Sequence, residues 1–356
     1  MTNPPSASGA GRPGEPYGHP MPSFAPPLSE VVTSREVVRA LLREQHPDLA
    51  DREIADPVEG FDMAVFRLGE DLAVRLPRHR EAVVSLDAEV RWAAKLSEGW
   101  TFPAQRIVRL GVPGEEFPWC WAVTSWLPGR IAAEHPLDAS AAPDLGRALA
   151  RIHRPAPADA PFDVEQSIRL IERDPVLRTM LRILPAVGAA RGLNLDSGAV
   201  EELWARALSV PDDAPRVWIH ADLHPFNVIS DGGRFGGIID WSSISRGDPA
   251  VDLGFLWLLL PRAAVGEAYR VYGDLDEATA ARAEGIGLVK AATLAGVPKD
   301  EVARIGWRAL AELGVAVRVG SDGGSGDLTR TGDRAVGRGG PGSRRRRRPD
   351  VPPRRP

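Results

Sequence analysis

The stretch His220-Ala-Asp-Leu-His-Pro-Phe-Asn227 holds the densest group of polar side chains in this sequence of 356 residues. Thirteen residues after Asn227, a second acid, Asp240, stands in Ile239-Asp-Trp241. An aspartate followed five residues later by an asparagine, and then by another aspartate, suits phosphoryl transfer. In that chemistry Asp222 would accept the proton of an attacking hydroxyl group, and Asn227 and Asp240 would offer oxygen ligands to Mg²⁺.

A β-hairpin is predicted between these two parts of the motif. The apolar runs 228–230 and 235–239 flank Asp231-Gly-Gly233, and glycine-containing turns of this kind join antiparallel strands. We expect this hairpin to bring Asn227 and Asp240 to one metal ion.

The spacing His-x-Asp-x-x-x-x-Asn is that of the protein-kinase catalytic loop. With Ile239-Asp-Trp241 and Gly247-Asp-Pro-Ala-Val-Asp-Leu253 it resembles the aminoglycoside phosphotransferase family, whose loop typically reads His-Gly-Asp-x-His-x-x-Asn. The resemblance covers roughly residues 35–310. It departs from the family pattern at Ala221 and Phe226, where the family often has glycine.

The resemblance implies a role for each polar residue of the three motifs. Asp222 is the expected catalytic base, and Asn227 and Asp240 are the expected Mg²⁺ ligands. Structural support of the loop is expected from His220, His224, Asp248 and Asp252.

The resemblance also implies a nucleotide site in the first part of the chain. Val74-Arg-Leu-Pro-Arg78 resembles the strand that carries the phosphate-contacting basic residue, where kinases generally have lysine. Arginine offers a planar fork instead of a point charge and will sit differently. The expected cofactor-binding residues are Arg75, its ion-pair partner Glu89, Gly60 in a phosphate-covering turn, and Ser125 and Leu127 in the linker that contacts the purine.

Hydrophobic periodicity predicts a strand-rich part followed by a mostly helical part. Glu89 is expected on one helix over 81–96, and another helix is expected over 164–184. The fold class is therefore α+β, a protein-kinase-like two-lobed fold with a small antiparallel-sheet N-lobe and a helical C-lobe. The expected divisions are a disordered extension 1–27, the N-lobe 28–127, the C-lobe 128–318 and a disordered Gly/Arg/Pro-rich tail 319–356.

The amino-acid composition excludes some kinds of site and partner. Cys120 is the single cysteine, which excludes a disulfide framework and a cysteine-based zinc site. The net charge of −4 combines a tail of about +6 over residues 319–356 with a body of about −10. An acidic body would attract a cationic acceptor, and Arg344–Arg348 are expected to be an extension and not a nucleic-acid site. Without a signal peptide or a membrane-spanning run, we expect a cytoplasmic protein with no membrane partner.

The residues leave several alternatives open. An aminoglycoside-type antibiotic is the expected acceptor, but a macrolide, a sugar, a choline-like alcohol or another metabolite fits the same motifs. ATP and GTP fit equally well as donors, and the sequence does not indicate an oligomeric state. A catalytically inactive nucleotide-binding protein is a second class. A third is a zinc hydrolase that uses the alternating side chains of His220, Asp222 and His224.

Overall fold

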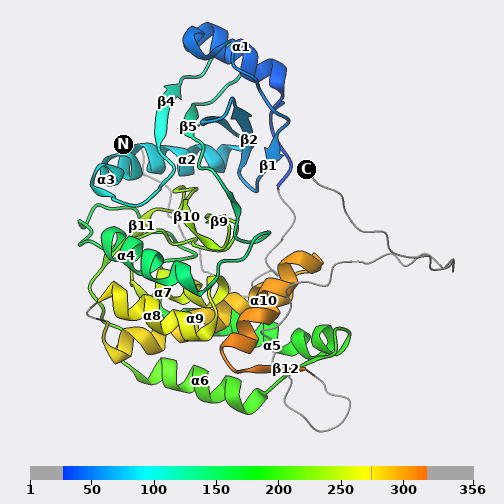
Figure 1. Ribbon diagram of the computed structural model, residues 1–356, viewed down its shortest axis with the longest axis vertical. Helices are drawn as coiled ribbons and strands as arrows, with labels where there is room; N and C mark the ends of the chain where they lie inside the picture. Colours follow the sequence, from blue (N-terminus) through cyan, green and yellow to red (C-terminus); the bar gives the residue numbers. More distant parts are fainter. Residues whose placement is uncertain (1–26, 274, 319–356) are drawn as a thin grey trace, which may run out of the picture.

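The computed structural model describes residues 27–273 and 275–318, and it is an α+β fold with a sheet at one end and helices at the other (Figure 1). The first helix is α1 (Arg35–Gln45), which Ser34 caps by accepting a hydrogen bond from Val37 N. A five-stranded antiparallel sheet follows, in the order β1-β2-β3-β5-β4. Its strands are β1 (Val58–Glu59), β2 (Met63–Leu68), β3 (Leu72–Pro77), β4 (Ile107–Gly111) and β5 (Trp121–Ser125).

Strand β3 is central in this sheet, and all six of its residues are buried. The hairpin from β2 turns at Gly69, whose φ of 64° lies in the region that glycine adopts without strain. Arg75 pairs with Val65 on one side and Ala122 on the other. Its backbone position is therefore fixed from both sides.

The helix expected over 81–96 is interrupted at Glu89. Helix α2 (Arg80–Ala88) gives way to a π-helical turn, η2 (Glu89–Ala93), before the short α3 (Ala94–Leu96). A π turn inserts one extra residue into the helix and often marks a functional site. Here it begins at the residue that forms the buried ion pair described below.

The larger part of the molecule contains seven of the α-helices in the described chain. They are α4 (Ala142–Ile152), α5 (Asp174–Ala189), α6 (Ser197–Ser209), α7 (Ala250–Leu259), α8 (Arg262–Tyr272), α9 (Glu277–Ala295) and α10 (Asp300–Glu312). Residues 250–260 are buried throughout, and α9 packs against α7 and α10.

The prediction of a helix over 164–184 is wrong for its first part. The chain is not α-helical before Asp174: the 3₁₀ turn η5 (Leu170–Arg173) precedes α5. The Asp163 carboxylate accepts hydrogen bonds from the amides of Glu165 and Gln166, each at 2.8 Å, which holds a turn in place of a helix. Pro175 then lies in the first turn of α5. Backbone N–H groups in a first turn have no partner within the helix, so the missing N–H of proline costs no hydrogen bond there.

Short antiparallel strand pairs lie outside the five-stranded sheet. The predicted hairpin is present as β9 (Val228–Asp231) and β10 (Arg234–Ile238), and β6 (Arg130–Ile131) pairs with β9. A bulge in β10 brings Gly237 (φ 137°) so close to Leu127 and Pro103 that a Cβ atom would lie 2.6 Å from each. The other pairs are β8 (Val217–Ile219) with β11 (Ser245–Gly247), and β7 (Leu193–Leu195) with β12 (Ala316–Arg318).

The hydrophobic cores do not follow the expected lobe boundary closely. One core lies between α1 and the five-stranded sheet, and the largest core lies among the helices. Ala93, Trp100 and Ala104 belong to the largest core although the N-lobe was expected to run to residue 127. Trp100 lies 4.0 Å from Trp241, centroid to centroid, so this segment packs on the part of the chain that follows the hairpin. The division at 127/128 stays a prediction.

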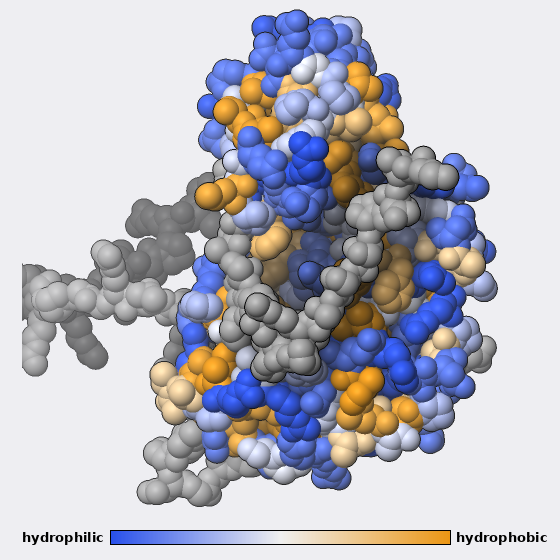
Figure 2. All heavy atoms as spheres, turned by 180° about the vertical axis from the view of Figure 1, so that it is seen from behind, coloured by the Kyte–Doolittle hydropathy of each residue, from blue (hydrophilic) through white to orange (hydrophobic). Residues whose placement is uncertain are grey.

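One face of the molecule is hollowed between the sheet end and the helical end, and hydrophilic side chains line much of the hollow (Figure 2). The terminal segments predicted to be disordered lie outside the described residues, apart from residue 27. Over the described ranges, none of the helices combines the length and the apolar character that crossing a membrane requires.

Candidate active site

The loop that holds Asp222 runs from β8 to β9 and is fixed by one buried carboxylate. Asp252, in the first turn of α7, accepts hydrogen bonds from His220 N at 2.7 Å and Ala221 N at 2.9 Å. His153 Nε2 donates to the same carboxylate at 3.1 Å, and the Tyr272 hydroxyl lies 3.0 Å from the other ring nitrogen of His153. Asp252 is completely buried, so these donors replace the water that it loses.

Ala221, which lies between His220 and Asp222, has an unusual backbone conformation. Ala221 has φ of 70°, a left-handed conformation in which an L side chain is strained. The expected family pattern has glycine here, and the conformation gives the physical reason. The alanine methyl group is fully buried, and at this φ the departure from the pattern costs strain.

Both ring nitrogens of His220 are occupied. Nδ1 accepts from Asp222 N at 3.3 Å, and Nε2 lies 3.1 Å from the carbonyl oxygen of Ile239, to which it donates in this tautomer. His220 therefore ties the Asp222 loop to the strand end before Asp240, which agrees with the supporting role expected for it. The zinc alternative finds no support, because these bonds leave His220 no free nitrogen, and the described residues contain no group of three or more acids, histidines or cysteines placed around a metal.

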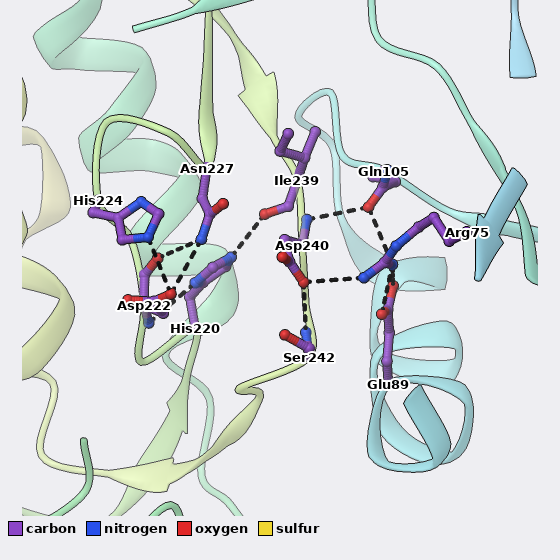
Figure 3. Close-up of polar contacts among 10 residues, drawn as sticks. All are labelled: Arg75, Glu89, Gln105, His220, Asp222, His224, Asn227, Ile239, Asp240 and Ser242. Atoms are coloured by element: carbon purple, nitrogen blue, oxygen red, sulfur yellow. Dashed lines mark hydrogen bonds and ion pairs between the residues drawn. The ribbon is translucent and has the colours of Figure 1, made fainter. Parts of the chain in front are cut away.

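Asp222 is held by two neighbours on its own loop (Figure 3). His224 Nε2 lies 3.3 Å from its Oδ2, and Asn227 Nδ2 donates to its backbone oxygen at 2.9 Å and to Oδ2 at 3.3 Å. Burial raises the pKa of Asp222, but the charge and hydrogen bond of His224, together with the charge of Lys290, outweigh burial and lower it well below the ordinary value. Burial opposes the charged form of His224, but the charge and hydrogen bond of Asp222 outweigh burial and raise the pKa of His224. The pair favours an ionised Asp222.

Asn227 lies beside the residue that precedes Asp240, at the base of the hairpin. Ile239 N donates to the backbone oxygen of Asn227 at 3.0 Å, and Asp240 follows with φ of 59°, which turns its side chain out of the strand. Gln105 Oε1 accepts from Asp240 N at 3.1 Å. Sequence analysis did not single out Gln105, because it lies in an irregular segment outside every motif.

Arg75 is the centre of an acidic cluster on the opposite side of Asp240. Its Nη1 donates to both oxygens of Glu89, at 2.8 and 2.7 Å, and its Nη2 donates to Asp240 Oδ1 at 3.1 Å. Its side chain is 3% exposed and that of Glu89 2%, so the pair is shielded from water. Burial opposes the charge, but Glu89 and Asp240 together raise the pKa of Arg75. Figure 3 shows Asp240 between this pair and the Asp222 loop.

A comparison with models of known protein families identifies the family. The model of the phosphotransferase enzyme family matches residues 53–286, well over half of the chain and the whole of the site just described. The chain belongs to this family. None of the functionally curated protein sequences matches it.

Solved structures agree on the fold of this phosphotransferase. The GDP complex of aminoglycoside 2′-phosphotransferase-IIIa is 15% identical, with a TM-score of 0.57, and the match covers 79% of this chain and 99% of that one. The GDP and kanamycin complex of APH(2″)-IIIa is 16% identical, with a TM-score of 0.54 and coverages of 78% and 98%. The gentamicin complex of APH(2″)-IIa is 16% identical, with a TM-score of 0.50 and coverages of 80% and 96%. At these identities the likeness establishes the kinase-like fold.

The turn at Gly60, which was expected to cover the phosphates, is held by hydrogen bonds from its own backbone and from Arg78. Gly60 N donates to Met63 O at 2.8 Å, and Arg78 Nη1 donates to the carbonyl oxygens of Gly60 at 2.9 Å and Phe61 at 3.3 Å. The Gly60 amide is therefore committed to the turn. Within the described chain, the amides of Phe61 and Asp62 form no such bond, and they are better placed to serve a phosphate.

In the linker that was expected to contact the purine, two of the backbone amides are already bonded within the protein. Ser125 N donates to Arg106 O at 2.8 Å and Trp126 N donates to Asp71 O at 2.7 Å, so neither amide can serve a purine. Leu127 N makes no backbone hydrogen bond within residues 27–273 and 275–318. Of the two linker residues expected to bind the cofactor, Leu127 is the one with an available donor.

Asp248 supports the fold of the phosphotransferase. Its carboxylate accepts from Ala250 N at 2.9 Å at the start of α7, and Arg282 Nε donates to it at 2.7 Å. Arg282, on α9, also donates to the carbonyl of Pro211, so this side chain joins α9 to the start of α7 and to the segment after α6. Asp248 is buried within this network and, like Asp252, serves as a structural residue.

Proposed function

We propose that this phosphotransferase transfers the γ-phosphoryl group of ATP or GTP to a hydroxyl group of a small molecule in the presence of Mg²⁺. The observation that carries the proposal is the arrangement around Asp240. On one side lies the Asp222–Asn227 loop, joined to it through Ile239, and on the other lies the buried Arg75–Glu89 pair.

Asp222 is the proposed catalytic base. The acceptor hydroxyl oxygen attacks the γ-phosphorus, its proton passes to Asp222 Oδ1 or Oδ2, and the bond from phosphorus to the bridging oxygen breaks to release ADP or GDP. Asn227 orients the carboxylate, and His224 keeps it ionised. Because phosphoryl transfer requires little covalent chemistry from the protein, positioning and charge stabilisation supply most of the rate.

The oxygen atoms available at the hairpin base fit Mg²⁺. Asp240 accepts from Arg75 and from Ser242 N on Oδ1, which leaves Oδ2 free of bonds among the described residues, and its side chain is 41% exposed. Asn227 uses its Nδ2 within the loop, so its Oδ1 can face a cation. Bound Mg²⁺ would neutralise phosphate charge, and Asn227 and Asp240 are the residues proposed to hold it.

The acceptor class is the finer part of the proposal. Aminoglycosides are the first class to test, since the neighbours of known fold are aminoglycoside phosphotransferases and one complex contains kanamycin. Macrolides, sugars and choline-like alcohols belong in the same panel.

The test is a nucleotide-consumption assay on the full chain. ATP and GTP are each supplied with Mg²⁺ and the acceptor panel, and release of ADP or GDP is measured together with the mass gain of the acceptor. We expect turnover that EDTA and Asp222→Asn abolish. Nucleotide binding without transfer to any acceptor, unchanged in Asp222→Asn, would instead identify an inactive binding protein. Resistance conferred on a sensitive host would assign an antibiotic as acceptor.

A further inference from the structure

Asp240, the proposed metal ligand, has a strained backbone. Its φ of 59° lies in the left-handed region, which costs energy for an L residue although aspartate enters it more often than most. Such a conformation persists only where the surrounding contacts hold it. The preceding residue is fixed from two sides, because Ile239 N donates to Asn227 O at 3.0 Å and Ile239 O accepts from His220 Nε2 at 3.1 Å. The contact at Asp240 N comes from a distant part of the chain.

Gln105, which no motif contains, provides this contact. Its Oε1 accepts from Asp240 N at 3.1 Å and from Arg75 Nη1 at 3.4 Å (Figure 3). Both neighbouring atoms are donors, so the oxygen of the amide and not its nitrogen faces them. Gln105 is only 9% exposed, so water has little access to take its place.

The backbone of Gln105 is anchored to the same hairpin. Gln105 N donates to Ile238 O at 2.9 Å, and Ile238 N donates to Pro103 O at 3.1 Å, which forms a parallel bridge between the two segments. Ile238 is the last residue of β10 and lies two residues before Asp240. The Gln105 side chain therefore begins at a position that is fixed relative to Asp240.

Gln105 and Arg75 together hold Asp240 at two of its atoms. Gln105 binds the backbone amide, and Arg75 Nη2 donates to Oδ1 at 3.1 Å. Because Arg75 also donates to Gln105, the three residues form a closed ring of hydrogen bonds. A side chain that is fixed at its backbone and at one carboxylate oxygen has little freedom to rotate, so the direction of the other oxygen, Oδ2, is set as well.

We propose that Gln105 is a positioning residue of the metal site, and that it holds Asp240 in the left-handed conformation that presents Oδ2 to Mg²⁺. This inference rests on the proposed function and adds to it a residue from outside the motifs. Gln105 acts through Asp240 and does not itself bind the metal. Its neutral amide accepts two hydrogen bonds without adding a negative charge beside Glu89 and Asp240.

The test measures how strongly Mg²⁺ increases the affinity for a nucleotide. Isothermal titration of the full chain with ATP and with GTP, each in Mg²⁺ and in EDTA, gives the ratio of the two affinities. Gln105→Leu removes the acceptor oxygen, and the cavity of about 10 Å³ beside Gln105 is at the lower limit for one water molecule that could replace it. We expect the ratio to fall about 10-fold, as is typical when a residue that orients a metal ligand is replaced, while the affinity in EDTA stays the same.

Further variants separate positioning from folding. Gln105→Asn withdraws the oxygen by one methylene but keeps the amide, and it should lower the ratio as Gln105→Leu does. Gln105→Glu keeps an acceptor oxygen at the same reach and should retain the wild-type ratio. Gln45→Leu is the matched control, because Gln45 also accepts from a backbone amide, Val112 N at 2.8 Å, in a contact that includes no residue of the site. Its loss should leave the ratio unchanged.

The outcomes distinguish this inference from the proposed function. A Mg²⁺ effect that Gln105→Leu and Gln105→Asn leave intact would overturn the inference and leave phosphoryl transfer standing. A Mg²⁺ effect that Gln105→Glu strengthens would identify a direct ligand, and one that it weakens as Gln105→Leu does would show that the acceptor oxygen is not what matters; either result refutes the positioning role. A wild type whose nucleotide affinity does not respond to Mg²⁺ would refute it too. Failure to phosphorylate any acceptor, beside a Mg²⁺ effect that Gln105→Leu and Gln105→Asn lower and Gln105→Glu retains, would refute the function and support the inference.

Discussion

The guanidinium of Arg75 binds Glu89 through one nitrogen and Asp240, 165 residues away in sequence, through another at 3.1 Å. One cation thus joins the middle of the five-stranded sheet, the π turn after α2 and the end of the β9–β10 hairpin. Lysine, a single point charge, could not reach both acids in this planar arrangement. Arg75 therefore fixes the position of Asp240, and in the proposed function it also sets the charge around the phosphates.

Replacing Arg75 by methionine is expected to reduce both stability and activity. Glu89 would be left buried without a partner, which typically costs about 3–5 kcal/mol of unfolding free energy. Phosphoryl transfer should fall about 100-fold or more, because the charge that steadies the phosphates and Asp240 is lost. Urea unfolding and steady-state kinetics measure the two effects.

The double variant Arg75→Met/Glu89→Met separates these effects. Removing both partners takes away the unpaired charge, so most of the stability should return while activity stays low. Arg109→Met, on the exposed face of β4, is the matched control and should alter neither. Recovery of activity in the double variant would contradict a role for Arg75 in the site.

Replacing Asp222 by asparagine is expected to lower kcat by about 10²- to 10⁴-fold, the usual contribution of a positioned general base. Nucleotide affinity should change little, since Asn227 and Asp240 remain. Isothermal titration with a nucleotide and Mg²⁺, beside single-turnover kinetics, tests both statements. Asp231→Asn, in the exposed hairpin turn, is the control. Wild-type turnover in Asp222→Asn would remove Asp222 from the mechanism.

Asp252→Asn is expected to weaken the catalytic loop without touching substrate. The buried carboxylate accepts from three donors, and an amide would turn an N–H toward at least one of them, at a cost of about 1–3 kcal/mol. We expect lower stability and a lower kcat with little change in either KM. Asp144→Asn, on an exposed helix face, should behave as wild type. A selective rise in nucleotide KM would show that Asp252 contacts the ligand instead.

The Asp222–His224 pair makes stability depend on pH. Because the pKa of His224 is raised on folding, its contribution is complete below the ordinary histidine value of about 6.5 and is lost as pH rises through the raised value. Asp222, with a lowered pKa, stays ionised throughout this range. Urea unfolding of wild type and His224→Asn between pH 5.5 and 9 should show a wild-type advantage that shrinks toward high pH. An advantage that grows with pH would mean that the pair is not charged.

Ala221→Gly is expected to stabilise the protein by about 0.5–1 kcal/mol. The left-handed conformation of Ala221 costs about 1–2 kcal/mol for an L residue, and glycine relieves this strain. Glycine also has greater conformational freedom in the unfolded chain, which offsets part of the stabilisation. Ala150→Gly, at an exposed position of α4, should destabilise by about 1 kcal/mol and serves as the opposite control. Thermal unfolding compares them. Destabilisation by both changes would show that the Ala221 methyl contact outweighs the strain.

Local sequence patterns predict the order of the strands and helices and the polar residues that the loop brings together. Asp222 and Asn227 lie within five residues of each other, so the turn that contains them fixes their relation. The hairpin signal at Asp231-Gly-Gly233 brings Asn227 to Asp240, because glycine turns and alternating apolar residues act locally. Arg75 on a strand and Glu89 on the next helix followed from the same local patterns.

The surroundings of these residues depend on tertiary contacts. The bond from Asp240 N to Gln105 and the ion pair from Arg75 to Asp240 join segments 135 and 165 residues apart, and no periodicity encodes such contacts. The π turn at Glu89 and the non-helical segment 164–169 depend on a buried ion pair and on side-chain caps, which override local propensity.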